Sequence, residues 1–283
     1  MTVLPRLSLF AATVLWFAGR APAQVYLGLD ATLASPYVWR GLTRANDWVL
    51  QPEGFAAVKT GGTFFSVGTW ASYELRAAGP TDLTDLGIGQ SGLAEVDYWA
   101  QAARAMGVFH AGVGAIRYTF RGTAPGAGRT RANNTTELYA SLRATSKYIV
   151  PGLAAWVDVD HVRGTYLEGS AEVPVLANPL AQPFIALITR ATLGYTLGQE
   201  LNASDPTQGG YFVRDGVTHL DLSASGDLTV HPLGLPAVIR VEGHVQFNVD
   251  DATRRTSADP SEAHRSAKLW AALALRVSGP VVR

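Results

Sequence analysis

The sequence contains no cysteine, little charge and no long apolar run beyond its N-terminal segment. The lack of cysteine excludes the small secreted domains that disulfides hold together. Charged residues make up 16% of the chain, against roughly 25% in soluble domains, while 47% of residues are hydrophobic. No later segment approaches the run of about 20 apolar residues that a membrane helix needs. Basic and acidic residues balance, so we expect no nucleic-acid partner.

The N-terminus has the three parts of a Sec-type export signal. Arg6 supplies the positive charge, Leu7–Gly19 is the apolar run, and Ala21-Pro22-Ala23 is a small-residue cleavage pattern. We therefore expect residues 1–23 to be a signal peptide and residues 24–283 to form one domain.

Strict two-residue alternation is the main pattern of the remaining chain, and it is clearest in Ala237–Val249 and Val217–Val230. Because the side chains of a strand point to alternate faces, each such segment has one apolar and one polar wall. The predicted strands are Val25–Leu42, Val49–Lys59, Thr63–Leu75, Leu93–Ala105, Val108–Phe120, Thr135–Thr145, Gly152–His161, Thr165–Leu176, Phe184–Leu197, Val217–Val230, Ala237–Val249 and Ser266–Val277. Most have the length of a tilted membrane strand, about 9–11 residues or slightly more.

The predicted connections differ in length on the two sides of the sheet. The short ones, rich in Gly and Pro, are Gly61-Gly62, Met106-Gly107, Ser146–Pro151, Ala177–Pro183 and His231–Pro236. The long polar ones include Arg76–Gly92, Arg121–Asn134, Gly198–Gly216 and Asp250–Arg265. Short periplasmic turns opposite long external loops are typical of outer-membrane barrels. The sequence thus predicts an all-β, antiparallel up-and-down barrel of about 12 strands in the outer membrane, with a soluble β-sandwich as the alternative fold.

The segment Ser35-Pro36-Tyr37-Val38-Trp39-Arg40-Gly41-Leu42, followed by Gln51-Pro52, resembles the N-terminal signature of the TorF-like porin family of outer-membrane proteins. The third predicted strand, Thr63-Phe64-Phe65-Ser66-Val67-Gly68-Thr69-Trp70-Ala71, continues this resemblance, which covers residues 25–75. It implies an exported barrel and, through the family name, a pore.

The alternation also predicts which charges face the lumen, since charged residues are costly on a lipid-facing wall. The candidate pore-lining residues are Arg40, Glu95, Asp97, Arg117, Arg143, Asp158, Asp160, Arg190, Asp221, Arg240, Glu242, His244 and Lys268. Such a wall either forms a channel that selects solutes or fills a narrow barrel with salt bridges. Acids lie among the basic residues on the same strands, which makes a track for anions the weaker hypothesis.

Several aromatic residues fall on the predicted lipid face near the external ends of the strands, where an interfacial girdle belongs. They are Tyr37, Trp39, Tyr73, Tyr118, Phe120, Tyr195 and Phe247. Arg40 has the opposite parity, so we expect it at the external mouth, either as a constriction or in a local salt bridge with Asp47 or Glu53.

The function that these patterns favour is a non-enzymatic, porin-like channel for passive diffusion of small hydrophilic solutes. Its expected partners are the lipid bilayer and lipopolysaccharide of the outer membrane, the barrel-assembly machinery and those solutes; no cofactor or metal motif is present. One alternative is a structural or adhesive barrel with a plugged lumen. A second is a lipid hydrolase on the barrel wall, for which the outward histidines would be His110 and His161.

Overall fold

The computed structural model describes residues 23–45, 47–75, 92–120, 134–178, 184–199, 211–212, 214–231, 236–249 and 267–282. Its strands are β1 (Gln24–Ser35), β2 (Tyr37–Trp39), β3 (Leu42–Ala45), β4 (Val49–Thr60), β5 (Thr63–Glu74), β6 (Gly92–Met106), β7 (Phe109–Phe120), β8 (Thr135–Ala144), β9 (Val150–Asp158), β10 (Thr165–Asn178), β11 (Phe184–Leu197), β12 (Gly216–Val230), β13 (Ala237–Asn248) and β14 (Ala267–Val282). The described residues include no helix long and apolar enough to cross a membrane.

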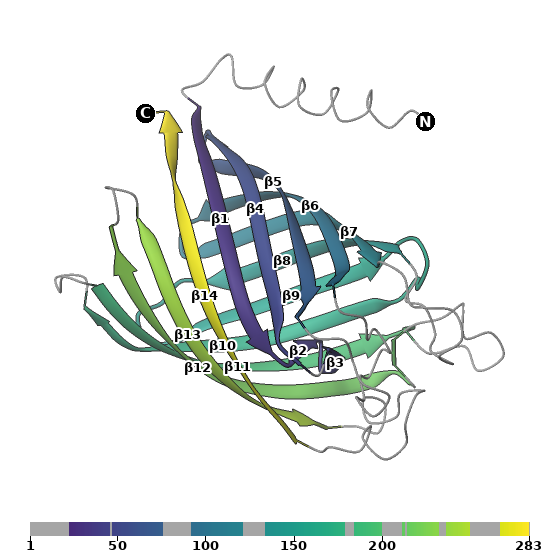
Figure 1. Ribbon diagram of the computed structural model, residues 1–283. Coiled ribbons are helices and arrows are strands. Elements are labelled where there is room, and N and C mark those ends of the chain that lie inside the picture. Colours follow the sequence, from purple (N-terminus) through teal and green to yellow (C-terminus); the bar gives the residue numbers. More distant parts are fainter. Residues whose placement is uncertain are drawn as a thin grey trace.

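β1 and β4 to β14 form a closed antiparallel barrel (Figure 1). From β4 to β14 each strand pairs with the next one in the chain, and β1 pairs with β4 and β14. The barrel closes where β1 pairs with β14, in a register that sets Leu29 opposite Val277. The predicted all-β barrel of about 12 strands is confirmed. We call the end where β1 begins and β14 ends the terminal end, and the opposite end the loop end.

The outer wall of the barrel is apolar, as the alternation predicts. More than a third of the surface of many large apolar side chains on this wall is exposed. They include Leu27, Leu29, Phe65, Val67, Tyr73, Leu138, Leu142, Leu153, Val157, Leu193, Tyr195, Leu222, Val241, Phe247, Leu269, Leu273 and Leu275. Residues one position away point inward and are largely polar, among them Asp30, Ser66, Ser72 and Gln246. A continuous apolar exterior of this kind marks a surface that meets something other than water.

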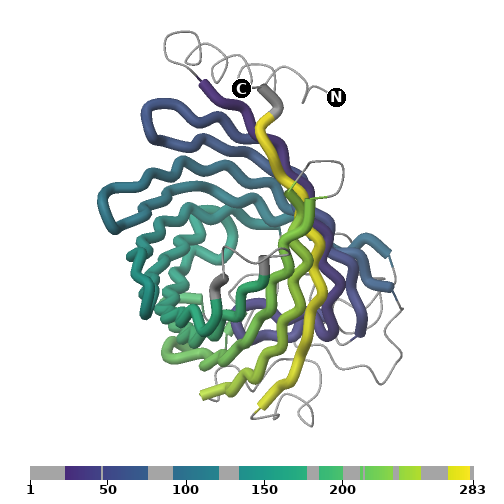
Figure 2. Tube along the Cα trace, turned by 90° about the vertical axis from the view of Figure 1, so that its left-hand side faces the viewer, coloured from purple at the N-terminus to yellow at the C-terminus, as the bar shows by residue number. Residues whose placement is uncertain are grey.

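A separate two-stranded sheet, β2–β3, interrupts this simple topology. The expectation that the first strand runs unbroken from Val25 to Leu42 is wrong, because β1 ends at Ser35 and the next residues form a small hairpin. The chain then returns to the wall as β4, which pairs with β1 so that Val49 lies opposite Ala34. Figures 1 and 2 show the hairpin at the loop end, within the outline of the barrel.

Two further expectations concern the two ends of the chain. The last strand does not end at Val277 but continues to Val282 as part of β14. The export signal, apart from Ala23, and almost all of the long loop segments lie outside the described residues, so the signal stays a prediction.

A closed ladder of backbone hydrogen bonds leaves no edge strand where unfolding can begin. We therefore expect the folded protein to migrate faster in a detergent gel when unheated than after boiling. A proline at Val241, in the middle of β13, removes a ladder donor and should abolish the fast-migrating band. If unheated and boiled samples of the unchanged protein run alike, the closed barrel is contradicted.

Candidate functional site

The β2–β3 hairpin turns at Arg40 and Gly41, with Trp39 paired to Leu42. Both turn residues have positive φ, 50° for Arg40 and 89° for Gly41, as a two-residue type I′ turn requires. Glycine adopts this conformation readily, and a Cβ at Gly41 would also lie only 3.0 Å from the side chain of His219 on β12. Arginine adopts it at a cost, so other contacts must hold Arg40 in place.

Those contacts centre on Glu137 of β8. The Arg40 guanidinium donates two hydrogen bonds to the Glu137 carboxylate, Nη1 to Oε1 at 2.7 Å and Nη2 to Oε2 at 2.6 Å. The Tyr118 hydroxyl donates a third bond to Oε2 at 2.9 Å. Both charged side chains are almost inaccessible, 6% exposed for Arg40 and 0% for Glu137. This is a buried bidentate pair, the arrangement that combines charge attraction with a fixed orientation.

Aromatic rings surround the same guanidinium. Its central carbon lies 4.4 Å from the ring centre of Trp39, 4.4 Å from that of Tyr166 and 5.2 Å from that of Trp156. Burial alone would lower the pKa of Arg40, but the Glu137 carboxylate, together with Tyr118 and Tyr166, outweighs that effect and raises the pKa of Arg40 above its ordinary value. Arg40 therefore stays charged, and the ring faces stabilise that charge.

The hairpin is also attached to other parts of the wall. Arg44 of β3 is buried, with its guanidinium 3.5 Å from Glu95 of β6 and over the ring of Phe120. From β13, Gln246 Nε2 donates to the Gly41 carbonyl at 2.9 Å, and Lys268 Nζ of β14 does so at 3.3 Å. Since β6 and β8 lie far from β13 and β14 in the order of the barrel, the hairpin crosses the lumen from one wall to the other.

Apolar packing completes this contact at the loop end. Leu42 and Trp39 of the hairpin pack with Val162, Tyr211 and Phe212. Trp39 also packs against a second cluster, in which Tyr118 and Phe120 of β7 are buried. The expectation that Tyr37, Trp39, Tyr118 and Phe120 belong to a lipid-facing girdle is wrong, because all four pack inside the barrel. Tyr73, Tyr195 and Phe247 are exposed, as expected for the outer wall.

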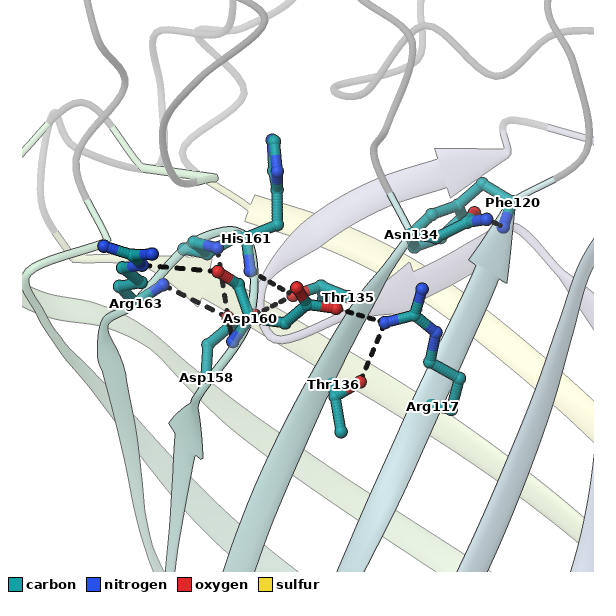
Figure 3. Close-up of polar contacts among 10 residues, drawn as sticks. Arg117, Phe120, Asn134, Thr135, Thr136, Asp158, Asp160, His161 and Arg163 are labelled. Carbon is teal, nitrogen blue, oxygen red and sulfur yellow. Dashed lines mark hydrogen bonds and ion pairs between the residues drawn. The ribbon is translucent and has the colours of Figure 1, made fainter. Parts of the chain in front are cut away.

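The connection from β9 to β10 is shaped by Asp158 (Figure 3). Its Oδ1 accepts hydrogen bonds from the backbone nitrogens of Asp160, Val162 and Arg163 at 3.0 to 3.1 Å. Its Oδ2 accepts one from Thr135 Oγ1 at 2.5 Å. This turn directs Val162 into the cluster beneath Leu42. Asp158 therefore supports the loop-end packing and is only 3% exposed.

Arg117 and Asp160 pair with each other at the loop-end rim, where Arg117 also donates to Thr136 (Figure 3). Successive side chains of a strand point to opposite faces. Because Tyr118 packs inside the barrel, its neighbour Arg117 lies on the outer face of β7. The expectation that Arg117 faces the lumen is therefore wrong. Asp160 lies beyond the end of β9, beside Arg117, and not on the inner wall.

On the terminal-end side of the hairpin lies a polar cavity of about 580 Å³. Val38, Arg40 and Gly41 of the hairpin border it, and inward side chains of β8 and β10 to β14 form its wall. The charged and imidazole members of that wall are Arg143, Glu168, Glu172, Arg190, His219, Asp221, Arg240, Glu242, His244 and Arg276. His244 Nδ1 donates a hydrogen bond to Asp221 Oδ1 at 2.9 Å, and the His244 ring stacks on that of Trp270.

The structure thus separates the predicted pore-lining residues into distinct places. Arg143, Arg190, Asp221, Arg240, Glu242 and His244 border the cavity together with Arg40. Glu95, Asp97 and Lys268 lie on the inner wall around the hairpin, where Lys268 reaches the Gly41 carbonyl. His110 is an even number of residues from Tyr118 on β7, so its side chain points to the inner face. The expectation that His110 lies on the outer face is therefore wrong. Among the described residues, no group of acidic and histidine side chains is arranged to hold a metal ion.

Arg44 and the aromatic residues around Arg40 are the parts of this site that the sequence did not indicate as functional. Gly41 was the available signal. A glycine inside an otherwise alternating run marks a turn or a close approach. Pro36 lacks a backbone donor and disfavours a continuous strand, so the two residues together indicate a hairpin within this run.

No protein-family model matches the sequence, and no curated protein matches it. The resemblance to the TorF-like porins is therefore not confirmed. Similar solved structures include a bacterial polysaccharide outer-membrane secretin, at 9% identity and a TM-score of 0.45, with 92% of this chain and 99% of that one covered. Others are OprD from Pseudomonas aeruginosa (11%, TM-score 0.34, 93% and 96% covered) and the translocator domain of the autotransporter NalP from Neisseria meningitidis (13%, 0.36, 96% and 94%). At these values the similarity carries no information about what this chain binds.

Removing the charge of Arg40 should destabilise the fold strongly, because it leaves Glu137 buried without its ionic partner. We expect Arg40→Met to lower the free energy of unfolding by about 3–5 kcal/mol, measured by urea titration of tryptophan fluorescence in detergent micelles. Adding Glu137→Leu to this variant should recover most of the loss, since an apolar pair needs no ionic partner.

Arg117→Met is the matched control, because it breaks an exposed pair at the rim. It should cost only about 0–1 kcal/mol. If Arg40→Met costs no more than Arg117→Met, the Arg40–Glu137 pair does not hold the hairpin.

Proposed function

We propose that this protein is a porin-like channel of the outer membrane that lets small hydrophilic solutes diffuse through its lumen. The observation that carries the proposal is the contrast between an apolar outer wall and a polar cavity enclosed by the same strands. Lipid is the environment that such an exterior fits, and export across the inner membrane is the expected route to it. The proposed partners are the lipid bilayer, lipopolysaccharide and the barrel-assembly machinery.

The cavity gives the channel its polar interior. Charged side chains from six strands border it, so a hydrated solute finds hydrogen-bond partners along the wall. The β2–β3 hairpin then forms the narrowest part of the path, because it crosses the lumen at the loop end. In this proposal the hairpin limits the rate of passage, and the cavity admits solutes from the terminal end.

The lipid-facing wall can be tested with matched lysines on one strand. Leu222 of β12 is 43% exposed on the outer wall, whereas Ser225 borders the cavity opposite Glu242. Leu222→Lys should destabilise the barrel in lipid vesicles by about 2–4 kcal/mol if Leu222 lies near the bilayer midplane. Ser225→Lys should cost less, since Glu242 can pair with the new charge. Equal costs in urea unfolding would count against a lipid-embedded wall.

The channel itself is tested by removing the hairpin. Because Ala34 pairs with Val49, Ser35 and Trp48 are opposite each other, so replacing residues 36–47 with Asn-Gly joins β1 to β4 by an ordinary two-residue turn. In planar bilayers we expect small conductance steps from the unchanged protein and steps several-fold larger from the shortened variant.

The other outcomes are equally informative. A variant that folds, as judged by its heat-dependent migration, yet passes no current at any voltage overturns the channel and favours a structural barrel. Equal steps from both proteins would leave the channel standing but show that the hairpin is not its narrowest part. Arg117→Gln, outside the lumen, should conduct like the unchanged protein.

A further inference from the structure

The charges that border the cavity nearly balance, which by itself predicts no preference between anions and cations. The basic side chains are Arg40, Arg143, Arg190, Arg240 and Arg276, and the acidic ones are Glu168, Glu172, Asp221 and Glu242. Arg40 is already paired with Glu137 and buried. The selectivity of the cavity therefore depends on how the remaining charges are presented to the lumen.

Each of the other arginines forms an ion pair with an acid on the same inner wall. The pairs are Arg143 Nη2 with Glu172 Oε1 at 2.7 Å, Arg190 Nη2 with Glu168 Oε1 at 3.0 Å, Arg240 Nε with Asp227 Oδ1 at 2.7 Å, and Arg276 Nε with Asp30 Oδ2 at 2.8 Å. They come from different strands, so the arrangement repeats around the cavity.

In every one of these pairs the arginine is the exposed partner. The Arg276 side chain is 55% exposed and Asp30 only 8%, and the Arg143 side chain is 54% exposed against 20% for Glu172. The Arg190 and Arg240 pairs show the same order. The short acidic side chains lie near the backbone of the wall, while the long arginine side chains extend toward the lumen.

This order determines what a solute meets. Each guanidinium has five N–H donors in a planar fork, and one carboxylate engages at most two of them in a bidentate pair, so donors stay available on the lumen side. Low-dielectric walls around a narrow space strengthen the field of the exposed charges. A carboxylate solute can accept hydrogen bonds from those donors, whereas the acids of the four pairs are shielded by their arginines. The two other acids of the cavity, Asp221 and Glu242, lie 2.9 and 3.6 Å from the His244 ring nitrogens.

We infer that the exposed arginines Arg143, Arg190, Arg240 and Arg276 make this cavity a binding site for small carboxylate anions. The inference deepens the proposed channel function, because it names the solute class that the lumen favours. It replaces the earlier expectation that interleaved acids cancel the basic residues.

The test is calorimetric titration of the full-length mature barrel in a nonionic detergent at low salt. Succinate is the probe, with the dication of 1,4-diaminobutane and neutral erythritol as comparison solutes. We expect measurable binding of succinate alone, weakened at least several-fold by Arg190→Gln or Arg240→Gln. Asp227→Asn, which frees Arg240, should strengthen it.

Arg117→Gln is the matched control, since it removes one arginine charge from the outside of the barrel and should leave succinate binding unchanged. Tighter binding of the dication, no succinate binding, or equal losses in Arg117→Gln and Arg240→Gln would each overturn the inference. The result is independent of conduction: succinate binding in a barrel that stays silent in bilayers even without the hairpin would contradict the channel and leave the anion site standing.

Discussion

The buried pair between Arg40 and Glu137 is the interaction on which the interior of this barrel depends. A barrel of this size has more internal space than its wall side chains fill, and here the β2–β3 hairpin occupies the loop end of that space. Arg40 stands at the hairpin's turn, in a backbone conformation that is costly for arginine. The bidentate carboxylate and the surrounding rings offset that cost and fix the turn against β8, β9 and β10.

The hairpin divides the interior into two regions with different chemistry. At the loop end, aromatic and aliphatic side chains pack tightly, and the charges among them are paired and buried. On the terminal-end side, the guanidinium groups of the four paired arginines border a polar cavity. The carboxylates that pair with them are less exposed than the arginines, as Asp30 is beside Arg276. In the proposed channel the first region would restrict passage and the second would contact the solute, so these two properties would arise from different residues.

Much of the wall follows from the sequence, because side-chain alternation reports directly which face meets water and which does not. The rule fails where the lumen itself is apolar. Tyr118 and Phe120 point inward to pack on the hairpin, so the inner face of β7 is the apolar one and alternation alone predicts the wrong face for Arg117. Alternation also cannot show that Arg40 and Glu137 meet, since that contact joins residues 97 positions apart.

The most direct test of this account is the accessibility of the hairpin within the folded protein. The chain has no cysteine, so a single Leu42→Cys reports on one buried position of β3, and Trp48→Cys, at a site 48% exposed, serves as the accessible reference. A hairpin held in the lumen predicts that a water-soluble maleimide labels Cys at position 48 rapidly and position 42 only after unfolding. Rapid labelling of both positions in the folded barrel would contradict the claim that the hairpin is packed inside the lumen at the loop end.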